Sequence, residues 1–151
     1  MHSELEAARA QFSHDELQEL EARRIDTLYR KQPDALSLAI GWMVWIAQFD
    51  ADRKLPSTDV SVRTEHDLAG ALFTRDSAED AIGTIPDRLG ARIVPFLEVG
   101  DNGLVSFTKE DPDAIMTKIA GIDPLGQAWW WFRRPVDGPL VDFLRFWDAP
   151  R

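Results

Sequence analysis

The feature that most constrains the fold is a stretch of almost unbroken apolar residues in the N-terminal half. Residues 36–49 include two tryptophans, and only Ser37, Gly41 and Gln48 interrupt the apolar run. The stretch is shorter than the roughly 20 apolar residues that a membrane-spanning helix needs. A helix that is apolar nearly all round must instead be covered by other elements on every side. We therefore expect a buried helix that begins near Pro33.

The regions on either side of this stretch predict further helices. The N-terminal region is rich in Glu, Ala, Leu, Arg and Gln, and Ser13 with Glu16 forms the pattern of a capping box. A helix start at this point leaves residues 1–12 as a separate, loosely attached helix. Further along, Thr64 and Ser77 each precede acidic residues, which favour the N-terminus of a helix. Two more helices are expected there.

The second half of the chain carries the β signals. In residues 93–108, two runs with β-branched and aromatic residues flank Gly-Asp-Asn-Gly, a pattern typical of a β-hairpin. Residues 127–134 have the aromatic density of a strand, and residues 140–148 fit a strand or, preferably, an amphipathic helix. We expect one globular domain of 151 residues with an α+β fold. N-terminal helices would precede a small, mainly antiparallel sheet and a Trp-rich C-terminal segment.

The charge balance narrows the choice of partner. The chain has 17 Lys and Arg against 26 Asp and Glu, which gives a formal net charge of -9. A nucleic-acid-binding protein neutralises phosphates with a basic surface, so nucleic acid is disfavoured as a partner, and anionic membranes are disfavoured for the same reason. The negative electrostatic field of such a chain would accelerate the encounter with a basic protein. An acidic surface also serves solubility alone.

The common catalytic and metal-binding motifs are missing from the sequence. Cysteine is absent, so disulfides, thiolate zinc sites and cysteine nucleophiles are excluded. His2, His14 and His66 are widely separated, and no phosphate-binding loop or G-x-S-x-G element occurs. We therefore expect no metal, no cofactor and no enzymatic activity. Because the first residues are acidic where a signal peptide is basic, we expect a cytoplasmic protein of bacterial type.

Tryptophans and acidic residues supply the candidate contact groups. Three consecutive tryptophans at positions 129–131 cannot all face one core if the segment is a strand, because successive side chains alternate between its faces. Either Trp130 points outward, or Trp129 and Trp131 do; Trp130 is taken as the candidate, covered by another element or available to a partner. Acidic residues cluster at expected turns and helix starts, which also explain them locally. The candidates for partner binding are Asp76, Glu79, Asp80, Glu98, Asp101, Glu110, Asp111, Asp113 and Trp130.

Three functions fit these observations. The first is an immunity or inhibitor protein that masks a basic toxin domain, such as a nuclease, by direct protein–protein binding. The second is a small enzyme or ligand-binding protein with a pocket lined by tryptophans and rimmed by carboxylates. The third is a homo-oligomeric structural subunit or adaptor. The sequence favours the first, because acidity, small size and the missing motifs agree with it.

Overall fold

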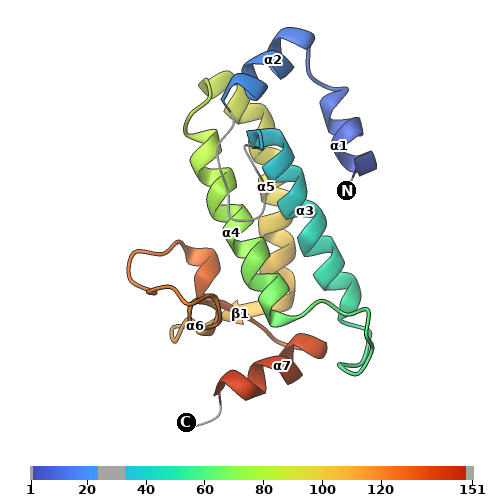
Figure 1. Ribbon diagram of the computed structural model, residues 1–151, viewed down its shortest axis with the longest axis vertical. Coiled ribbons are helices and arrows are strands. Elements are labelled where there is room, and N and C mark those ends of the chain that lie inside the picture. Colours follow the sequence, from blue (N-terminus) through green and yellow to red (C-terminus); the bar gives the residue numbers. More distant parts are fainter. Residues whose placement is uncertain (1, 24–32, 149–151) are drawn as a thin grey trace.

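A computed structural model describes residues 2–23 and 33–148 (Figure 1). Within these residues the chain forms α-helices, one 3-10 helix (η1) and two short strands, so the expected α+β class is confirmed. In chain order the elements are α1 (His2–Arg9), α2 (His14–Ala22), α3 (Ala35–Asp52), α4 (Glu65–Ile82), α5 (Asp87–Phe107), β1 (Thr108–Glu110), α6 (Ile115–Ala120), η1 (Trp129–Phe132), β2 (Arg133–Pro135) and α7 (Pro139–Asp148).

The three longest helices form a bundle in which α3 contacts both α4 and α5 (Figure 1). The apolar sequence of α3 explains its central place, since nearly every side chain in its first half is buried and so are Ile46 and Phe49 in its second half. Its N-terminus is capped by Asp34, whose side chain accepts a 2.8 Å hydrogen bond from the backbone N–H of Ser37. The expected buried helix is confirmed, although it extends to Asp52.

The N-terminal helices pack at one end of this bundle. The capping box of Ser13 and Glu16 is confirmed, with both hydrogen bonds formed at the start of α2. Residues Ala8 and Phe12 are buried, and Arg9 forms a 2.6 Å ion pair with Asp34. Residues 2–12 therefore have specific contacts with α3 and with the residue that caps its N-terminus. The composition of the N-terminal region predicts that the second helix runs to about residue 31, but α2 ends at Ala22, and residues 24–32 fall outside the described residues.

Helix α4 differs from the expectation at one point. Its start at Thr64 is confirmed, with a capping box between Thr64 and Asp67. The predicted second start at Ser77 is wrong, because α4 continues through this residue to Ile82. Buried Ala78 and Ala81 prolong its apolar face beyond Ser77, so the helix gains more from continuing than from a new cap.

The predicted hairpin over residues 93–108 is also wrong, because α5 occupies this region. Gly100 and Gly103 are helical residues that face α3 rather than turn residues: a Cβ atom there would lie 2.4 Å from the ring of Trp42 and 2.7 Å from Ile46. The two glycines permit close approach of α5 to α3. The buried side of α5 has helical spacing, with Leu89, Ile93, Leu97, Gly100, Leu104 and Phe107. Tertiary burial therefore overrides the local β and turn preferences.

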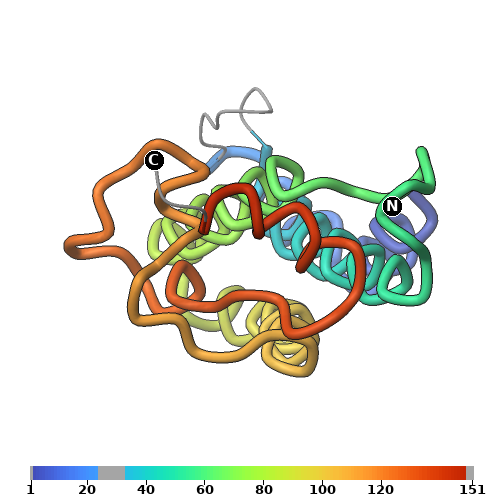
Figure 2. Tube along the Cα trace, turned by 90° about the horizontal axis from the view of Figure 1, so that it is seen from below, coloured from blue at the N-terminus to red at the C-terminus, as the bar shows by residue number. Residues whose placement is uncertain are grey.

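The remaining elements form what we call the C-terminal cap, residues 108–148, at the end of the bundle away from α1 and α2 (Figures 1 and 2). Strands β1 and β2 pair antiparallel, with Thr108 opposite Pro135 and Glu110 opposite Arg133. The strand expected in the Trp-rich segment forms only after η1. The helical alternative for residues 140–148 is confirmed by α7.

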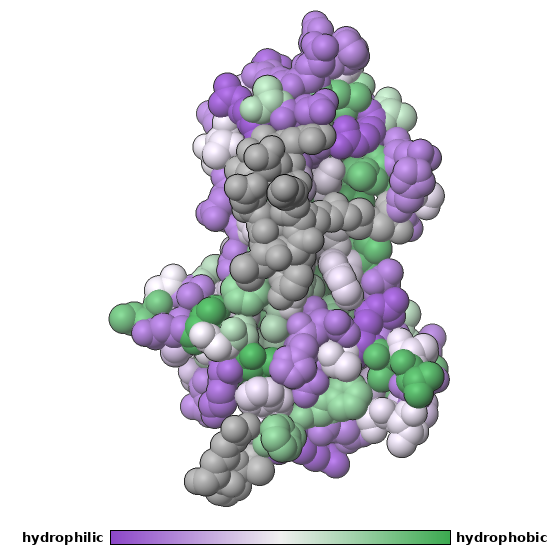
Figure 3. All heavy atoms as spheres, viewed as in Figure 1, coloured by the Kyte–Doolittle hydropathy of each residue, from purple (hydrophilic) through white to green (hydrophobic). Residues whose placement is uncertain are grey.

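On the face shown in Figure 3, hydrophilic residues alternate with separate patches of apolar residues. Within residues 2–23 and 33–148, no helix combines the length and the apolar content needed to cross a membrane.

Candidate protein-binding site

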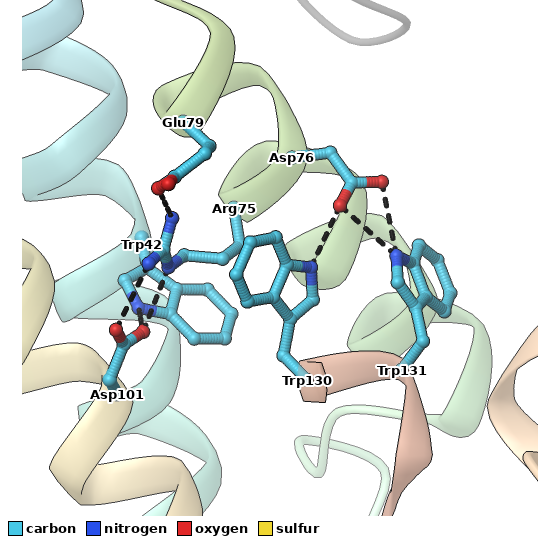
Figure 4. Close-up of polar contacts among 7 residues, drawn as sticks. All are labelled: Trp42, Arg75, Asp76, Glu79, Asp101, Trp130 and Trp131. Carbon is cyan, nitrogen blue, oxygen red and sulfur yellow. Dashed lines mark hydrogen bonds and ion pairs between the residues drawn. The ribbon is translucent and has the colours of Figure 1, made fainter. Parts of the chain in front are cut away.

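Asp76 of α4 fixes the Trp-rich turn to the bundle (Figure 4). The indole Nε1 of Trp130 donates a 2.8 Å hydrogen bond to Asp76 Oδ1, and that of Trp131 lies 3.1 and 3.0 Å from Oδ1 and Oδ2. Both rings are buried, and Trp131 also packs edge-on against Phe73. Hydrogen bonds to a charged acceptor are among the stronger ones, so this carboxylate anchors η1 to α4.

The electrostatics of Asp76 follow from this enclosure. Burial raises the pKa of the Asp76 carboxyl, the two indole N–H groups oppose that rise, and the nearby charge of Asp80 adds to it. A carboxyl with a raised pKa is a candidate for acid–base chemistry when it opens into a cleft. Here both oxygens are occupied by indoles, so the geometry gives Asp76 a structural role.

Arg75 organises a second polar cluster beside the first (Figure 4). Its Nε and Nη2 donate to the two oxygens of Asp101 at 2.8 and 3.0 Å, and its Nη1 donates to Glu79 at 2.7 Å. Trp42 Nε1 donates to the same Asp101 at 3.0 Å, and the guanidinium lies 4.1 Å from the ring centre of Trp130. Burial acts to lower the pKa of Arg75, but the two carboxylates outweigh it and raise the pKa. This cluster joins α3, α4, α5 and η1.

Four of the nine predicted contact residues are therefore engaged inside the protein: Asp76, Asp101, Asp111 and Trp130. The side chain of Asp111 is buried, accepts a 2.9 Å hydrogen bond from the backbone N–H of Ile115 and lies 3.3 Å from Nε of Arg134. The outward placement of Trp130 is wrong, because a 3-10 turn does not alternate its side chains as a strand does. The polar groups of all four are thus engaged in contacts within the protein, and Trp130 and Asp111 are buried.

The other five predicted residues are exposed: Glu79, Asp80, Glu98, Glu110 and Asp113. Glu79 pairs with Arg75, whereas the other four carboxylates form no ion pair or hydrogen bond in the described part of the chain. Asp80 lies on α4, Glu98 on α5, Glu110 at the end of β1 and Asp113 in the turn after β1. Glu110 and Asp113 flank the buried Asp111 in the chain.

A pocket of about 300 Å³ lies next to this turn, lined by Glu110, Asp111, Pro112, Trp129, Phe132 and Arg133. Trp129 is 44% exposed and meets Trp130 edge-on at 5.7 Å. Trp129, Phe132 and Arg133 were not among the sequence-based candidates. The run of tryptophans pointed to this segment, but strand alternation pointed to Trp130 rather than to Trp129, which is the exposed ring.

The described residues include no group of three or more His, Asp or Glu side chains that could hold a metal ion. A comparison of the chain with protein-family models, with curated proteins and with solved structures found no match. The function is therefore argued from the site and the charge distribution.

Proposed function

We propose that this chain is a small acidic cytoplasmic binding protein of bacterial type, an immunity or inhibitor protein that neutralises a basic toxin, such as a nuclease, by direct protein–protein binding. The observation that carries the proposal is the distribution of charge. In residues 2–23 and 33–148 the arginines are engaged within the protein, whereas a set of surface carboxylates forms no ion pair, and neither do the exposed lysines Lys54, Lys109 and Lys118.

The arginines illustrate the first half of this statement. Ion pairs with the chain's own carboxylates are formed by Arg9, Arg53, Arg63, Arg75, Arg88, Arg92, Arg134 and Arg145. Arg23 and Arg133 donate to backbone carbonyls instead. Part of the net charge of -9 is therefore carried by exposed carboxylates that form no ion pair, such as those of Asp80, Glu98 and Asp113. Such a field accelerates the capture of a basic protein and disfavours anionic partners.

The engagement of Asp76 supports binding over catalysis. It is the described carboxyl whose pKa is raised by burial, and its oxygens face indole N–H groups rather than a cavity. A second candidate, a small-ligand-binding protein or enzyme, is favoured by the pocket beside Trp129. The two candidates differ in what binds there, a protein side chain or a free metabolite.

The proposal is tested by co-expression with the basic proteins encoded next to this gene. We expect that one of them arrests growth alone, and that the full chain restores growth and forms a stable complex with it. If no neighbouring basic protein is toxic, or if the chain does not relieve the toxicity, the inhibitor role is wrong.

Surface charge is tested within the same system. A triple variant, Asp80→Asn with Glu98→Gln and Asp113→Asn, should associate with the toxin more slowly at low salt and dissociate at nearly the wild-type rate. A matched control carries the neutral surface changes Gln18→Asn and Asn102→Gln, and it should associate as the wild type does. Equal association rates for all three proteins would contradict electrostatic capture.

A further inference from the structure

The protein twice holds an arginine between an aromatic ring and a carboxylate. Arg75 lies 4.1 Å from the ring centre of Trp130 while it pairs with Asp101. Arg92 lies 4.2 Å from the ring centre of Phe12 while its Nη1 is 2.5 Å from Glu16. Cation–π attraction and a charge-assisted hydrogen bond act together in each case.

The pocket beside Trp129 presents the aromatic and acidic members of such an arrangement. The half-exposed ring of Trp129 lies with Phe132 and Pro112 in its lining, and Glu110 supplies an exposed carboxylate. That carboxylate has no ion pair among residues 2–23 and 33–148. In the same described residues, the arginines stacked on a ring are Arg75 and Arg92, so Trp129 carries none.

Lys109 precedes Glu110 in the chain but forms no ion pair with it, and Arg133, which also lines the pocket, points its guanidinium to other acceptors. Arg133 lies opposite Glu110 in the strand pair, yet its Nε donates to Thr108 Oγ1 at 3.0 Å and its Nη2 to the Thr108 carbonyl at 3.0 Å. Its Nη2 also lies 3.5 Å from the carbonyl oxygen of Val105, at the C-terminus of α5, where a positive charge is favourable. The next cation, Arg134, is engaged by Asp148 and Asp111. Glu110 therefore has no ion pair within the described residues, and its carboxylate can pair with an external cation on the side of the pocket away from the guanidinium contacts of Arg133.

We propose that this pocket binds one arginine side chain of the basic partner. The guanidinium would stack on Trp129 and pair with Glu110, and its aliphatic stem would lie against Phe132 and Pro112. Arginine is favoured over lysine because its planar fork stacks on rings and pairs bidentately with a carboxylate. The pocket volume of about 300 Å³ suits a single side chain rather than a folded element. This inference rests on the proposed function, which supplies the basic partner.

The direct test titrates the full chain with N-acetyl-arginine amide and follows the indole N–H signals of the six tryptophans by NMR. We expect a saturable shift of the Trp129 signal with millimolar affinity, while the signals of buried Trp42 and Trp131 stay in place. N-acetyl-lysine amide should bind more weakly. If the arginine amide leaves Trp129 unshifted, or if lysine amide binds as well, the proposal is wrong.

Variants locate the binding. Glu110→Gln should lower the affinity for the arginine amide about fivefold, and Trp129→Ala should lower it at least as much. Because Glu110 is exposed and unpaired in the described chain, E110Q should fold normally even if W129A does not. The matched control Glu98→Gln removes another exposed, unpaired carboxylate, on α5, and should bind as the wild type does. If E98Q and E110Q weakened the binding of the arginine amide equally, net charge alone would explain the effect, and the proposed arginine pocket would be wrong.

The same variants separate this inference from the inhibitor role. Growth rescue that is indifferent to W129A and E110Q would overturn the arginine pocket and leave the inhibitor role standing. A saturable arginine shift in a chain that neutralises no neighbouring toxin would overturn the inhibitor role and leave the pocket standing.

Discussion

The helix bundle and the C-terminal cap are held together in different ways. In the bundle, large apolar side chains such as Trp42, Phe49 and Ile93 are fully buried between α3, α4 and α5. The cap buries Met116, Trp131 and Leu144 in the same apolar core, and individual polar contacts, most clearly those of Asp76, add to its attachment to the bundle. Damage to the bundle should therefore affect the whole fold, whereas loss of one polar contact should loosen the cap alone.

The largest effect is expected where α5 touches α3. Gly100→Ala would place its Cβ atom 2.4 Å from the fully buried ring of Trp42, which has no room to move. We expect a loss of about 3 kcal/mol in the free energy of unfolding, measured by urea denaturation.

The control for this substitution lies in the same helix. In Gly90→Ala the new Cβ atom would meet Ile82 at 3.5 Å, an ordinary contact distance. Because alanine is the better helix former, this variant should gain up to about 1 kcal/mol. Equal losses at both positions would contradict the close-approach explanation for Gly100.

The next effect concerns the anchor of the cap. Asp76→Ala leaves the indole N–H groups of Trp130 and Trp131 buried without their acceptor, so we expect a loss of about 2 kcal/mol. Near-UV circular dichroism of the tryptophans should weaken while the helical far-UV signal persists. The matched control Asp80→Ala removes an exposed, unpaired carboxylate one turn away and should change stability by less than about 0.5 kcal/mol. A loss of helical signal in D76A would show that cap and bundle unfold as one unit.

Two carboxyl groups that hold the cap should affect the free energy of unfolding in opposite ways as the pH changes. Burial raises the pKa of Asp76, whereas the hydrogen bonds of Arg53 lower the pKa of Asp137, both from an ordinary value of 3.8. The stabilisation from Asp137 is full above its unfolded pKa and is lost as the pH falls through the lower folded pKa. For Asp76 the folded state binds the proton more tightly than the unfolded state does. Ionisation of Asp76 therefore lowers the free energy of unfolding, and this loss diminishes as the pH falls through the raised folded pKa. NMR titration of the carboxyl carbons should give the order Asp76 above Asp137, and the reverse order would contradict these environments.

The smallest effect is expected at the margin of the cap. Arg53 forms 2.7 Å hydrogen bonds to both oxygens of Asp137, but the two side chains are 31% and 52% exposed. Asp137→Asn should therefore lower the midpoint of thermal unfolding only slightly, and the difference should vanish in 1 M NaCl. A large effect that persists in salt would mean that the cap depends on its margin as much as on Asp76.

The parts of the fold that sequence predicts are those set by local rules. The burial of α3 follows from its composition, and the helix starts at Ser13 and Thr64 follow from side chains three residues apart. The helix α5 could not be predicted in this way. Its Gly100 and Gly103 resemble turn residues until the side chains of Trp42 and Ile46 are known to lie opposite them.

The candidate site shows the same division. The prediction that acidic residues lie on the surface is correct for Glu110 and Asp113, which are exposed. Asp76 was assigned to the surface because its indole partners lie 54 and 55 residues further along the chain. The exposed ring, Trp129, could be selected only once the 3-10 geometry of the turn was known.

The carboxylate shared by two adjacent indoles also limits how this sequence can evolve. Replacing Asp76 alone leaves two buried indole N–H groups without an acceptor. Replacing either Trp130 or Trp131 alone removes a hydrogen-bond donor from the partly buried carboxylate of Asp76. These three positions should therefore change in concert among relatives of this chain, as a coupled Asp–Trp–Trp signature. A distant homologue would be recognised by this covarying triplet even where the surrounding helices had diverged beyond alignment.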